Sequence, residues 1–192
     1  MNFDHPLILA SKSPRRQQLL SEAGFKFVVK SVEVDESYPI ELDPKEVAKY
    51  LAEKKAKASQ QELTNELLIA ADTVVIVDNQ LLGKPITHHD AKRMLRLMSG
   101  RTHLVITGVA IASNSKLVSF DDTTEVTFKV LTDDEIDHYI NEYKPFDKAG
   151  AYGIQEWIGM IGIVKIEGSF FNVVGLPVHK VYEELNKMKA LL

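Results

Sequence analysis

The sequence of 192 residues has no cysteine and no long apolar run. Without cysteine the chain forms no disulfide and no thiolate metal site, although this fixes no cellular compartment. No segment approaches the roughly 20 apolar residues of a membrane-spanning helix. The apolar stretch at residues 7–10 follows no basic region and is too short for the core of a signal peptide. These absences predict a cytoplasmic protein without membrane association.

Positive charge is not in excess, because the formal net charge is −4 at pH 7 and the pI is near 5.9. A protein that binds polymeric nucleic acid normally presents a broad basic surface, so this balance disfavours that class. A small phosphorylated ligand needs only a local positive pocket and stays compatible with it. The hydrophobic share of 45% supplies a packed core. The length favours a single domain over residues 1–192.

Apolar runs that are typical of strands alternate with segments that carry helix-start signals. Residues 67–77 are almost entirely apolar and rich in β-branched residues, which indicates a strand buried on both faces. The alternation predicts an α/β fold with a mixed sheet flanked by helices. Further strands are expected at 7–10, 25–29, 81–82, 103–112 and 117–130, with strands and irregular loops in the glycine-rich segment 150–175. Helices are expected to start at Ser13-Pro14, Asp43-Pro44, Thr87, Thr132 and Pro177.

Asp72 lies inside the central apolar run. An ionised carboxylate there is costly unless a cation, a metal or several hydrogen-bond donors meet it. Asp72 is therefore either a structural residue paired with an interior Arg or Lys, or a catalytic or metal-binding carboxylate at the rim of the sheet. On a regular strand Thr73 faces the opposite side, so the two serve one site only where the strand ends, bends or bulges.

Residues 11–16, Ser-Lys-Ser-Pro-Arg-Arg, follow the first expected strand and open a helix. Free backbone N–H groups and the helix dipole make such a junction suitable for an anion. Arg15 and Arg16 in the first turn break the usual preference for acids there, and arginine presents forked donors to phosphate oxygens. We favour a phosphate site over a solvated basic turn, because cations at a helix N-terminus need a reason to be tolerated.

Two lysines extend this positive character. Val47, Leu51 and Lys55 lie four residues apart on one helical stripe. Lys55 therefore either snorkels to water or reaches a buried anion. Lys84 stands in the turn Gly-Lys-Pro, whose defined backbone path suits delivery of an ammonium group to a ligand phosphate.

Carboxylates supply hard oxygen ligands. Glu33, Asp35 and Glu36 form an acidic patch after the second expected strand, which is either a solvated loop or part of a metal site. A divalent ion that bridges a triphosphate takes one or two carboxylates together with water and phosphate oxygens. Glu36 and Asp72 are the candidates for that role.

Other chemistry-bearing patterns are weak. Adjacent His88 and His89 diverge on a helix, so a metal site there is not supported. No Ser-His-Asp arrangement emerges from spacing, and neither GxGxxG nor GxxxxGK[ST] occurs, so nicotinamide and P-loop interpretations lack support. The segment around Gly150 and Gly153 permits a close approach of backbone to a ligand, unless it forms only a tight hairpin. Gln155 offers a paired donor and acceptor to the edge of a base.

Seven short motifs occur in order along the chain: Ala-Ser-Lys-Ser-Pro-Arg-Arg, Leu-Ala-Glu-Lys-Lys-Ala, Ala-Asp-Thr-Val-Val, Gly-Lys-Pro, Ser-Gly-Arg-Thr-His, Lys-Ala-Gly-Ala-Tyr-Gly-Ile-Gln and Asn-Val-Val-Gly-Leu-Pro. Together, over residues 7–177, they closely resemble the Maf-like family of nucleoside triphosphate pyrophosphatases. The resemblance implies an α/β fold with a long twisted mixed sheet and a ligand cleft between two lobes. It also implies hydrolysis of a nucleoside triphosphate to the monophosphate and pyrophosphate with a divalent cation, Mg²⁺ or Mn²⁺.

The resemblance also assigns site roles. Asp72 corresponds to the general base for water attack at the α-phosphorus, and it lies near the metal together with Glu36. The residues that correspond to triphosphate contacts are Ser11, Arg16, Lys55 and Lys84.

Base preference follows from three further positions. Arg15, Thr73 and Gln155 match the residues that the dTTP/UTP branch of the family uses for base selection. The branch that acts on 7-methyl-GTP carries an aromatic residue in place of Arg15 and lacks the Tyr-Gly-Ile-Gln run. The chain is therefore expected to hydrolyse dTTP and UTP. Glu156 departs from the glycine of many relatives and bears on base preference.

Two other functions stay open. A nucleotide-binding regulator of cell division would keep the pocket without turnover, although Asp72 argues against it because binding alone needs no base. A pyrophosphatase for a different or modified nucleotide would differ in substrate profile. The expected partner is a small-molecule nucleoside triphosphate, and a homodimer is left open.

Overall fold

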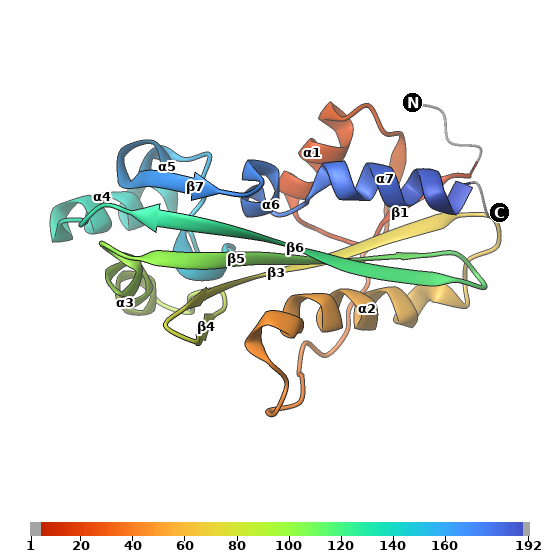
Figure 1. Ribbon diagram of the computed structural model, residues 1–192, viewed down its shortest axis with the longest axis horizontal. Coiled ribbons are helices and arrows are strands. Elements are labelled where there is room, and N and C mark those ends of the chain that lie inside the picture. Colours follow the sequence, from red (N-terminus) through yellow and green to blue (C-terminus); the bar gives the residue numbers. More distant parts are fainter. Residues whose placement is uncertain (1–4, 190–192) are drawn as a thin grey trace. The chain divides into compact units, whose positions relative to one another are not determined.

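The computed structural model describes residues 5–189, in which a mixed β-sheet is flanked by helices (Figure 1). The strands are β1 (Leu7–Leu9), β2 (Phe27–Val29), β3 (Leu67–Val77), β4 (Gln80–Leu82), β5 (Thr102–Ala112), β6 (Leu117–Phe128) and β7 (Ile163–Glu167). Over the described part of the chain they form one seven-stranded sheet in the order β2-β1-β3-β5-β6-β7, with β4 pairing β3. β1 runs parallel to β2 and β3, whereas the β3–β4 and β6–β7 pairs are antiparallel. The predicted α/β fold with a mixed sheet is confirmed.

The five helices with predicted start signals begin at Pro14, Val47, His88, Asp133 and Val178, at these signals or shortly after them. Ser13 precedes α1 with Pro14 at its first position, and Thr132 forms a complete capping box with Glu135 at the start of α4. Between residues 5 and 189, no helix has both the length and the apolar character that crossing a bilayer requires. The helices are α1 (Pro14–Glu22), α2 (Val47–Gln60), α3 (His88–Met98), α4 (Asp133–Tyr143), α5 (Trp157–Gly162), α6 (Phe170–Val174) and α7 (Val178–Lys189), with 3₁₀ turns η1 (Pro44–Glu46) and η2 (Ala149–Ala151).

The glycine-rich segment 150–175 departs from the prediction of strands and irregular loops. It contains β7, but also the short helices α5 and α6, so the prediction is partly wrong. Gly159 permits α5, because a Cβ at this position would lie 1.9 Å from the carbonyl oxygen of Ile154. The helix packs directly on the preceding turn, a close backbone contact that the pattern of residue types does not reveal.

The chain divides into two compact units. Unit 1 contains the chain up to Asp72, the segment Thr107–Asp122 and the chain from Gly175 onward. Unit 2 contains Thr73–Ile106 and Thr123–Val174. Strands β3, β5 and β6 contribute residues to both units. Each unit has its own cluster of buried apolar side chains.

In unit 1, strand pairing fixes where the chain enters α1. Leu9 lies opposite Ile69 in parallel register, and the N–H of Ala10 donates to the carbonyl oxygen of Ile69 at 2.8 Å. The chain that leaves β1 therefore runs beside the section of β3 that leads to Asp72. Figure 1 shows α1 and α7 on one side of β3, with α2 on the other side.

Helix α2 packs closely on the sheet of unit 1. A Cβ at Gly108 of β5 would lie 2.2 Å from the backbone nitrogen of Lys49 on α2. Ala52 of α2 and Ala70 of β3 belong to the same buried cluster. Small residues on both sides of this contact therefore bring the helix backbone close to the strands.

The core of unit 2 contains a buried histidine among aromatic rings. His103 is 1% exposed, and its ring centroid lies 5.3 Å from that of Phe128. Nε2 of His103 forms a 2.8 Å hydrogen bond with the hydroxyl group of Tyr152. Burial lowers the pKa of His103 to about 3, so the imidazole stays neutral in the folded protein at neutral pH.

We expect Gly108→Ala to lower the free energy of unfolding by about 3 kcal/mol or more, because the methyl group overlaps the α2 backbone rather than a movable side chain. Gly83→Ala is the matched control, since nothing lies within 4 Å of a Cβ at that position. The control should change stability by less than about 0.5 kcal/mol. Chemical denaturation measures the free energy of unfolding of wild type and of both variants. Equal stability of the two would contradict the close packing of α2.

His103 makes stability depend on pH. In the unfolded chain this histidine is protonated below about pH 6.5, its ordinary pKa. In the folded chain it stays neutral down to about pH 3. The contribution of His103 to stability is therefore complete above pH 6.5 and falls by about 1.4 kcal/mol per pH unit between these values.

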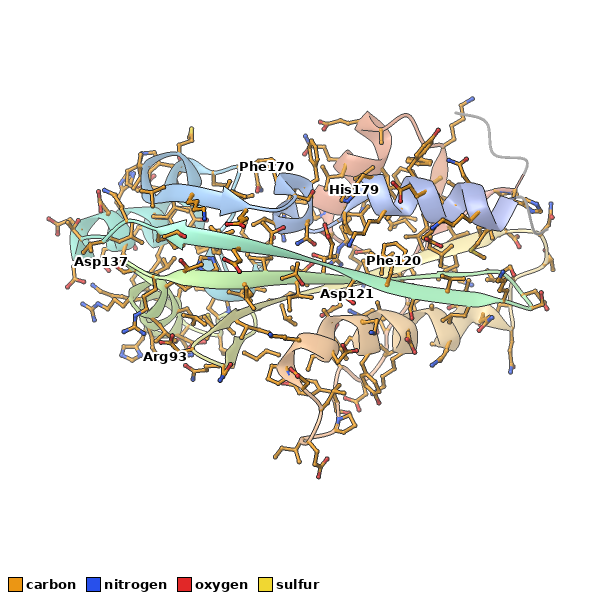
Figure 2. The ribbon with its side chains drawn as sticks, in the orientation of Figure 1. Arg93, Phe120, Asp121, Asp137, Phe170 and His179 are labelled. Carbon is orange, nitrogen blue, oxygen red and sulfur yellow. The ribbon has the colours of Figure 1, made fainter. Side chains whose placement is uncertain are left out.

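Denaturation of wild type and His103→Gln from pH 7 to pH 4 measures this dependence. We expect the difference in the free energy of unfolding between wild type and His103→Gln to shrink steadily as the pH falls below about 6.5. His179→Gln, which removes an exposed imidazole from α7, controls for the loss of a histidine (Figure 2). A constant difference between wild type and His103→Gln across the pH range would contradict burial of a neutral His103.

Candidate active site

The N-terminal end of α1 presents basic residues, as the sequence predicts for an anion site. The N–H of Ser13 donates to the hydroxyl oxygen of Ser11 at 3.2 Å, which holds Ser11 beside the start of the helix. Arg15 is half-buried in the first turn. Lys12 instead forms an exposed ion pair with Glu33 at 2.8 Å. Ser11 and Arg15 therefore lie at the positive end of the helix dipole.

Arg16 binds backbone groups of unit 1. Its Nε donates to the carbonyl oxygen of Gly175 at 2.8 Å, and one terminal nitrogen donates to that of Ala71 at 2.9 Å. The same nitrogen lies 3.3 Å from the hydroxyl oxygen of Ser11. Burial lowers the pKa of the guanidinium, while the charge of Asp72 opposes this effect. Arg16 thus joins α1 to Gly175, to Ser11 in the segment after β1 and to the residue before Asp72. It also contributes a positive charge to the surroundings of that carboxylate.

Lys55 reaches a buried anion, which is one of the two alternatives that its helical stripe left open. Val47 and Leu51 are buried on the same stripe of α2. The Lys55 ammonium donates to Asp72 Oδ1 at 2.6 Å and lies 2.8 Å from Glu36 Oε1. The side chains of Lys55 and Asp72 are only 12% and 18% exposed. One lysine therefore compensates the charge of the carboxylate inside β3 and binds a second carboxylate, from Glu36 of the acidic patch.

The other two residues of the acidic patch have different partners. Glu33 pairs with Lys12, while Asp35 accepts hydrogen bonds from the backbone and hydroxyl of Ser37. Asp35 and Ser37 also lie near Lys54. Glu36 is thus the member of the patch that joins Lys55 and Asp72.

The strand geometry separates Thr73 from Asp72. β3 continues without interruption through both residues. Leu68 and Ala70 cluster with residues of α2, and Lys55 of α2 meets Asp72, so these even-numbered residues face α2. Because side chains alternate along a strand, Thr73 belongs to the opposite row. Its role in base selection stays a prediction and requires a ligand that reaches the other face of β3.

The remaining predicted residues belong to unit 2. Lys84 is exposed in the turn after β4. The N–H of Gly150 donates to the carbonyl oxygen of Gly83 at 3.0 Å, which ties this turn to the glycine-rich segment. Gln155 is exposed just before α5. Contacts of Lys84 and Gln155 with a nucleotide stay predictions.

Unit 2 also contains a group of buried polar side chains around Lys148, the first residue of the Lys-Ala-Gly-Ala-Tyr-Gly-Ile-Gln motif, to which the sequence assigned no role. The side chain of Lys148 is 9% exposed and lies 2.8 Å from Asp147 and 3.1 Å from Glu156. Tyr139 of α4 donates its hydroxyl hydrogen to Glu156. A signal was present, because Lys148 opens an apolar and glycine-rich run that otherwise contains no cation before Gln155.

The carboxylates of unit 1 fit a cation whose coordination shell is completed by a ligand. No group of three or more His, Asp or Glu side chains within residues 5–189 is arranged to hold a metal ion. His88, for which the sequence did not support a metal site, forms a 3.1 Å hydrogen bond with Asn141 through its Nε2 atom. Glu36 and Asp72 both contact one ammonium group and are thus close enough to share a cation. Mg²⁺ characteristically uses one or two protein carboxylates and fills its shell with water and phosphate oxygens.

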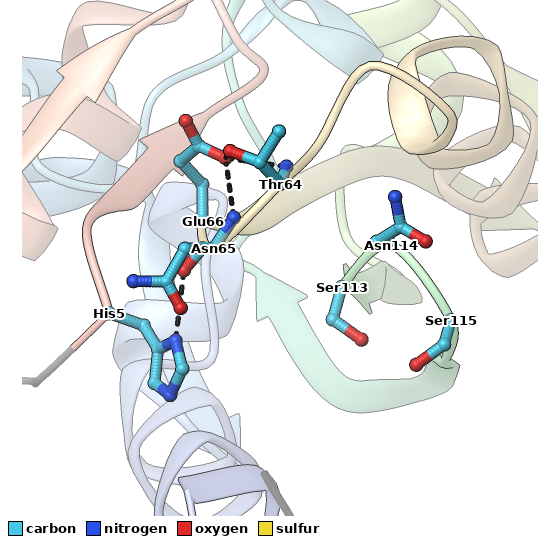
Figure 3. Close-up of a pocket in the computed structure, with 7 residues that line it drawn as sticks. All are labelled: His5, Thr64, Asn65, Glu66, Ser113, Asn114 and Ser115. Carbon is cyan, nitrogen blue, oxygen red and sulfur yellow. Dashed lines mark hydrogen bonds between the residues drawn. The ribbon is translucent and has the colours of Figure 1, made fainter.

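A polar pocket of about 190 Å³ in unit 1 does not contain the predicted site residues (Figure 3). Its lining residues are His5, Thr64, Asn65, Glu66, Ser113, Asn114 and Ser115. His5 bonds the carbonyl oxygen of Asn65 at 2.9 Å, and Glu66 accepts from the N–H of Thr64 at 2.8 Å. This lining carries no lysine or arginine, so it does not match a triphosphate.

The fold and the residues around Asp72 define an α/β protein with a basic helix start beside a carboxylate pair. The chain belongs to the Maf-like family, because a family model described as "Maf-like protein" matches residues 6–188. The resemblance inferred from the seven motifs is confirmed.

Curated relatives cover nearly the whole chain. A protein of Porphyromonas gingivalis is 51% identical over 185 residues, which are 94% of this chain and 93% of the relative. A protein of Cytophaga hutchinsonii is 51% identical over 182 residues, which are 95% of this chain and 84% of the relative. A protein of Flavobacterium johnsoniae is 48% identical over 185 residues, which are 96% and 95% of the two chains. All three relatives are named dTTP/UTP pyrophosphatase.

Proposed function

We propose that this protein hydrolyses dTTP and UTP to the nucleoside monophosphate and pyrophosphate. The observation that carries the proposal is the cluster of Lys55, Asp72 and Glu36 beside the basic start of α1. The names and near-complete coverage of the relatives support the substrate class. The expected ligand is accordingly a small-molecule nucleoside triphosphate.

Asp72 is the proposed general base. Its Oδ1 accepts from Lys55, so the carboxylate is held in one orientation and Oδ2 is assigned to the attacking water. The water oxygen bonds to the α-phosphorus while Asp72 accepts a proton from the water. The bond from the α-phosphorus to the oxygen that bridges to the β-phosphate then breaks, and pyrophosphate leaves.

Positive charge stabilises the phosphates during this step. Ser11, Arg16 and Lys55 are proposed triphosphate contacts from unit 1, and their meeting near Asp72 supports this assignment. Lys84 of unit 2 is proposed for the same role from the family resemblance. Arg15, Thr73 and Gln155 are the proposed base-selecting residues.

Glu36 and Asp72 are the residues that would hold a divalent cation, Mg²⁺ or Mn²⁺. When bound, such an ion supplies additional positive charge to the phosphate oxygens. Lys55, which contacts both carboxylates, keeps them together and compensates their charge.

A nucleotide panel tests the proposed function. Purified protein with Mg²⁺ is incubated with dTTP, UTP, CTP, dATP, GTP and 7-methyl-GTP, and pyrophosphate and orthophosphate are assayed separately. We expect pyrophosphate from dTTP and UTP. Selective release from another nucleotide would overturn the roles of Arg15 and Gln155, while binding of dTTP without any release would favour a nucleotide sensor.

We expect Asp72→Asn to fold normally and to lose turnover of dTTP by about 10²- to 10⁴-fold, the usual contribution of a general base. The amide keeps the shape of the side chain but is a far weaker proton acceptor. Asp78→Asn is the matched control, because it removes an exposed carboxylate that pairs with Arg101. Near wild-type turnover by Asp72→Asn in a pyrophosphate assay would sink the assignment.

A further inference from the structure

The Gly153–Glu156 turn of unit 2 carries Gln155. The N–H of Glu156 donates to the carbonyl oxygen of Gly153 at 3.0 Å and closes this turn. Ile154, the second residue of the turn, is buried in the core of unit 2. Gln155, the third residue, is exposed. The turn therefore anchors one side chain in the core and presents the next one to the surroundings.

Both ends of the Gly153–Glu156 turn are bound to one tyrosine of α4. The hydroxyl oxygen of Tyr139 accepts from the N–H of Gly153 at 3.0 Å, and its hydrogen is donated to Glu156 Oε2. Burial and the hydrogen bond with Glu156 raise the pKa of Tyr139, so its hydroxyl keeps this proton at neutral pH. A single hydroxyl group thus links the first and last residues of the turn.

Glu156 has a second partner that fixes its carboxylate. Its other oxygen, Oε1, lies 3.1 Å from the ammonium of Lys148, and the side chain is 20% exposed. The residue is therefore held from two directions by largely buried groups, unlike the exposed pair of Lys165 and Glu167 on β7. Ion pairs that are shielded from water hold their geometry better than solvated ones.

The packing around Glu156 leaves the turn little freedom. A Cβ at Gly153 would lie 2.8 Å from the carboxyl carbon of Glu156, so the carboxyl group rests against the Gly153 backbone. On the other side, Gly159 of α5 lets the helix contact the carbonyl oxygen of Ile154. Glu156 is thus a structural part of the turn rather than a solvated residue beside it.

We propose that Glu156, acting through Tyr139 and Lys148, is a positioning residue that holds Gln155 in the orientation for base selection. This inference rests on the proposed function, in which Gln155 reads the base. A preorganised amide binds without losing conformational entropy at the moment of recognition. Loss of the Glu156 charge removes its ion pair with Lys148 and weakens its hydrogen bond with Tyr139, which lets the turn fluctuate. The cost therefore appears in nucleotide discrimination rather than in the chemical step.

Steady-state kinetics of Glu156→Gln test the proposal, with Glu167→Gln as the matched control for loss of a carboxylate from an ion pair. We expect Glu156→Gln to raise KM for dTTP by about tenfold, to change kcat by less than about twofold, and to reduce the ratio of kcat/KM for dTTP over CTP by about tenfold, as expected for about 1.4 kcal/mol of lost discrimination. The control should keep wild-type values.

Tyr139→Phe gives an independent second variant. It removes the hydroxyl that accepts from Gly153 and donates to Glu156. We therefore expect it to reduce the ratio of kcat/KM for dTTP over CTP, as Glu156→Gln does. Tyr143→Phe is its control, because Tyr143 stacks on Tyr139 with ring centroids 5.1 Å apart and lies more exposed at the end of α4. Unchanged KM and unchanged preference in Glu156→Gln, or an equal loss on dTTP and CTP, would overturn the proposal.

Trp157 separates failure of this inference from failure of the proposed function. It is the single tryptophan of the sequence, follows Glu156 directly and packs on His138 with ring centroids 4.7 Å apart. We expect iodide to quench its fluorescence more strongly in Glu156→Gln than in wild type or Glu167→Gln. If wild type releases no pyrophosphate, the proposed function fails, and unchanged quenching would then also overturn the positioning role.

Discussion

The contact between Lys55 and Asp72 is the interaction on which the rest of the candidate site depends. A carboxylate inside an apolar strand is tolerated only with a partner, and the ammonium at 2.6 Å provides one. The same ammonium binds Glu36 and thereby holds this residue of the acidic patch beside β3. Removing the lysine would leave two carboxylates close together without the ammonium group that they share, which is unfavourable for folding and for binding an anionic ligand.

Close packing of the backbone brings Lys55 and Asp72 together. Gly108 lets α2 approach the sheet closely enough for Lys55 to reach β3, and parallel pairing of β1 with β3 brings the start of α1 to the same place. Arg16 then binds carbonyl groups of Ala71 and Gly175, which joins the segments around the site. The charged groups proposed for catalysis therefore also organise unit 1.

The sequence predicted the elements whose signals are local. The apolar run around Asp72 indicated β3, whereas the four-residue stripe that ends at Lys55 left open whether this lysine reaches water or a buried anion. The contacts of Arg16 were not predictable, because Gly175 lies 159 residues away. The helix α5 was missed because its glycines and β-branched residues favour strands or turns locally, whereas the close contact at Gly159 decides its structure. The roles of Thr73, Lys84 and Gln155 depend on a bound nucleotide, which no local pattern specifies.

Hydrolysis of dTTP in ¹⁸O-labelled water tests the central claim most directly. Attack of a water molecule on the α-phosphorus, with Asp72 as its base, places the label in dTMP and leaves pyrophosphate unlabelled. Mass spectrometry of the two products measures this partition after a single turnover. Label in pyrophosphate, or release of orthophosphate in place of pyrophosphate, would contradict the account and require a different reacting centre.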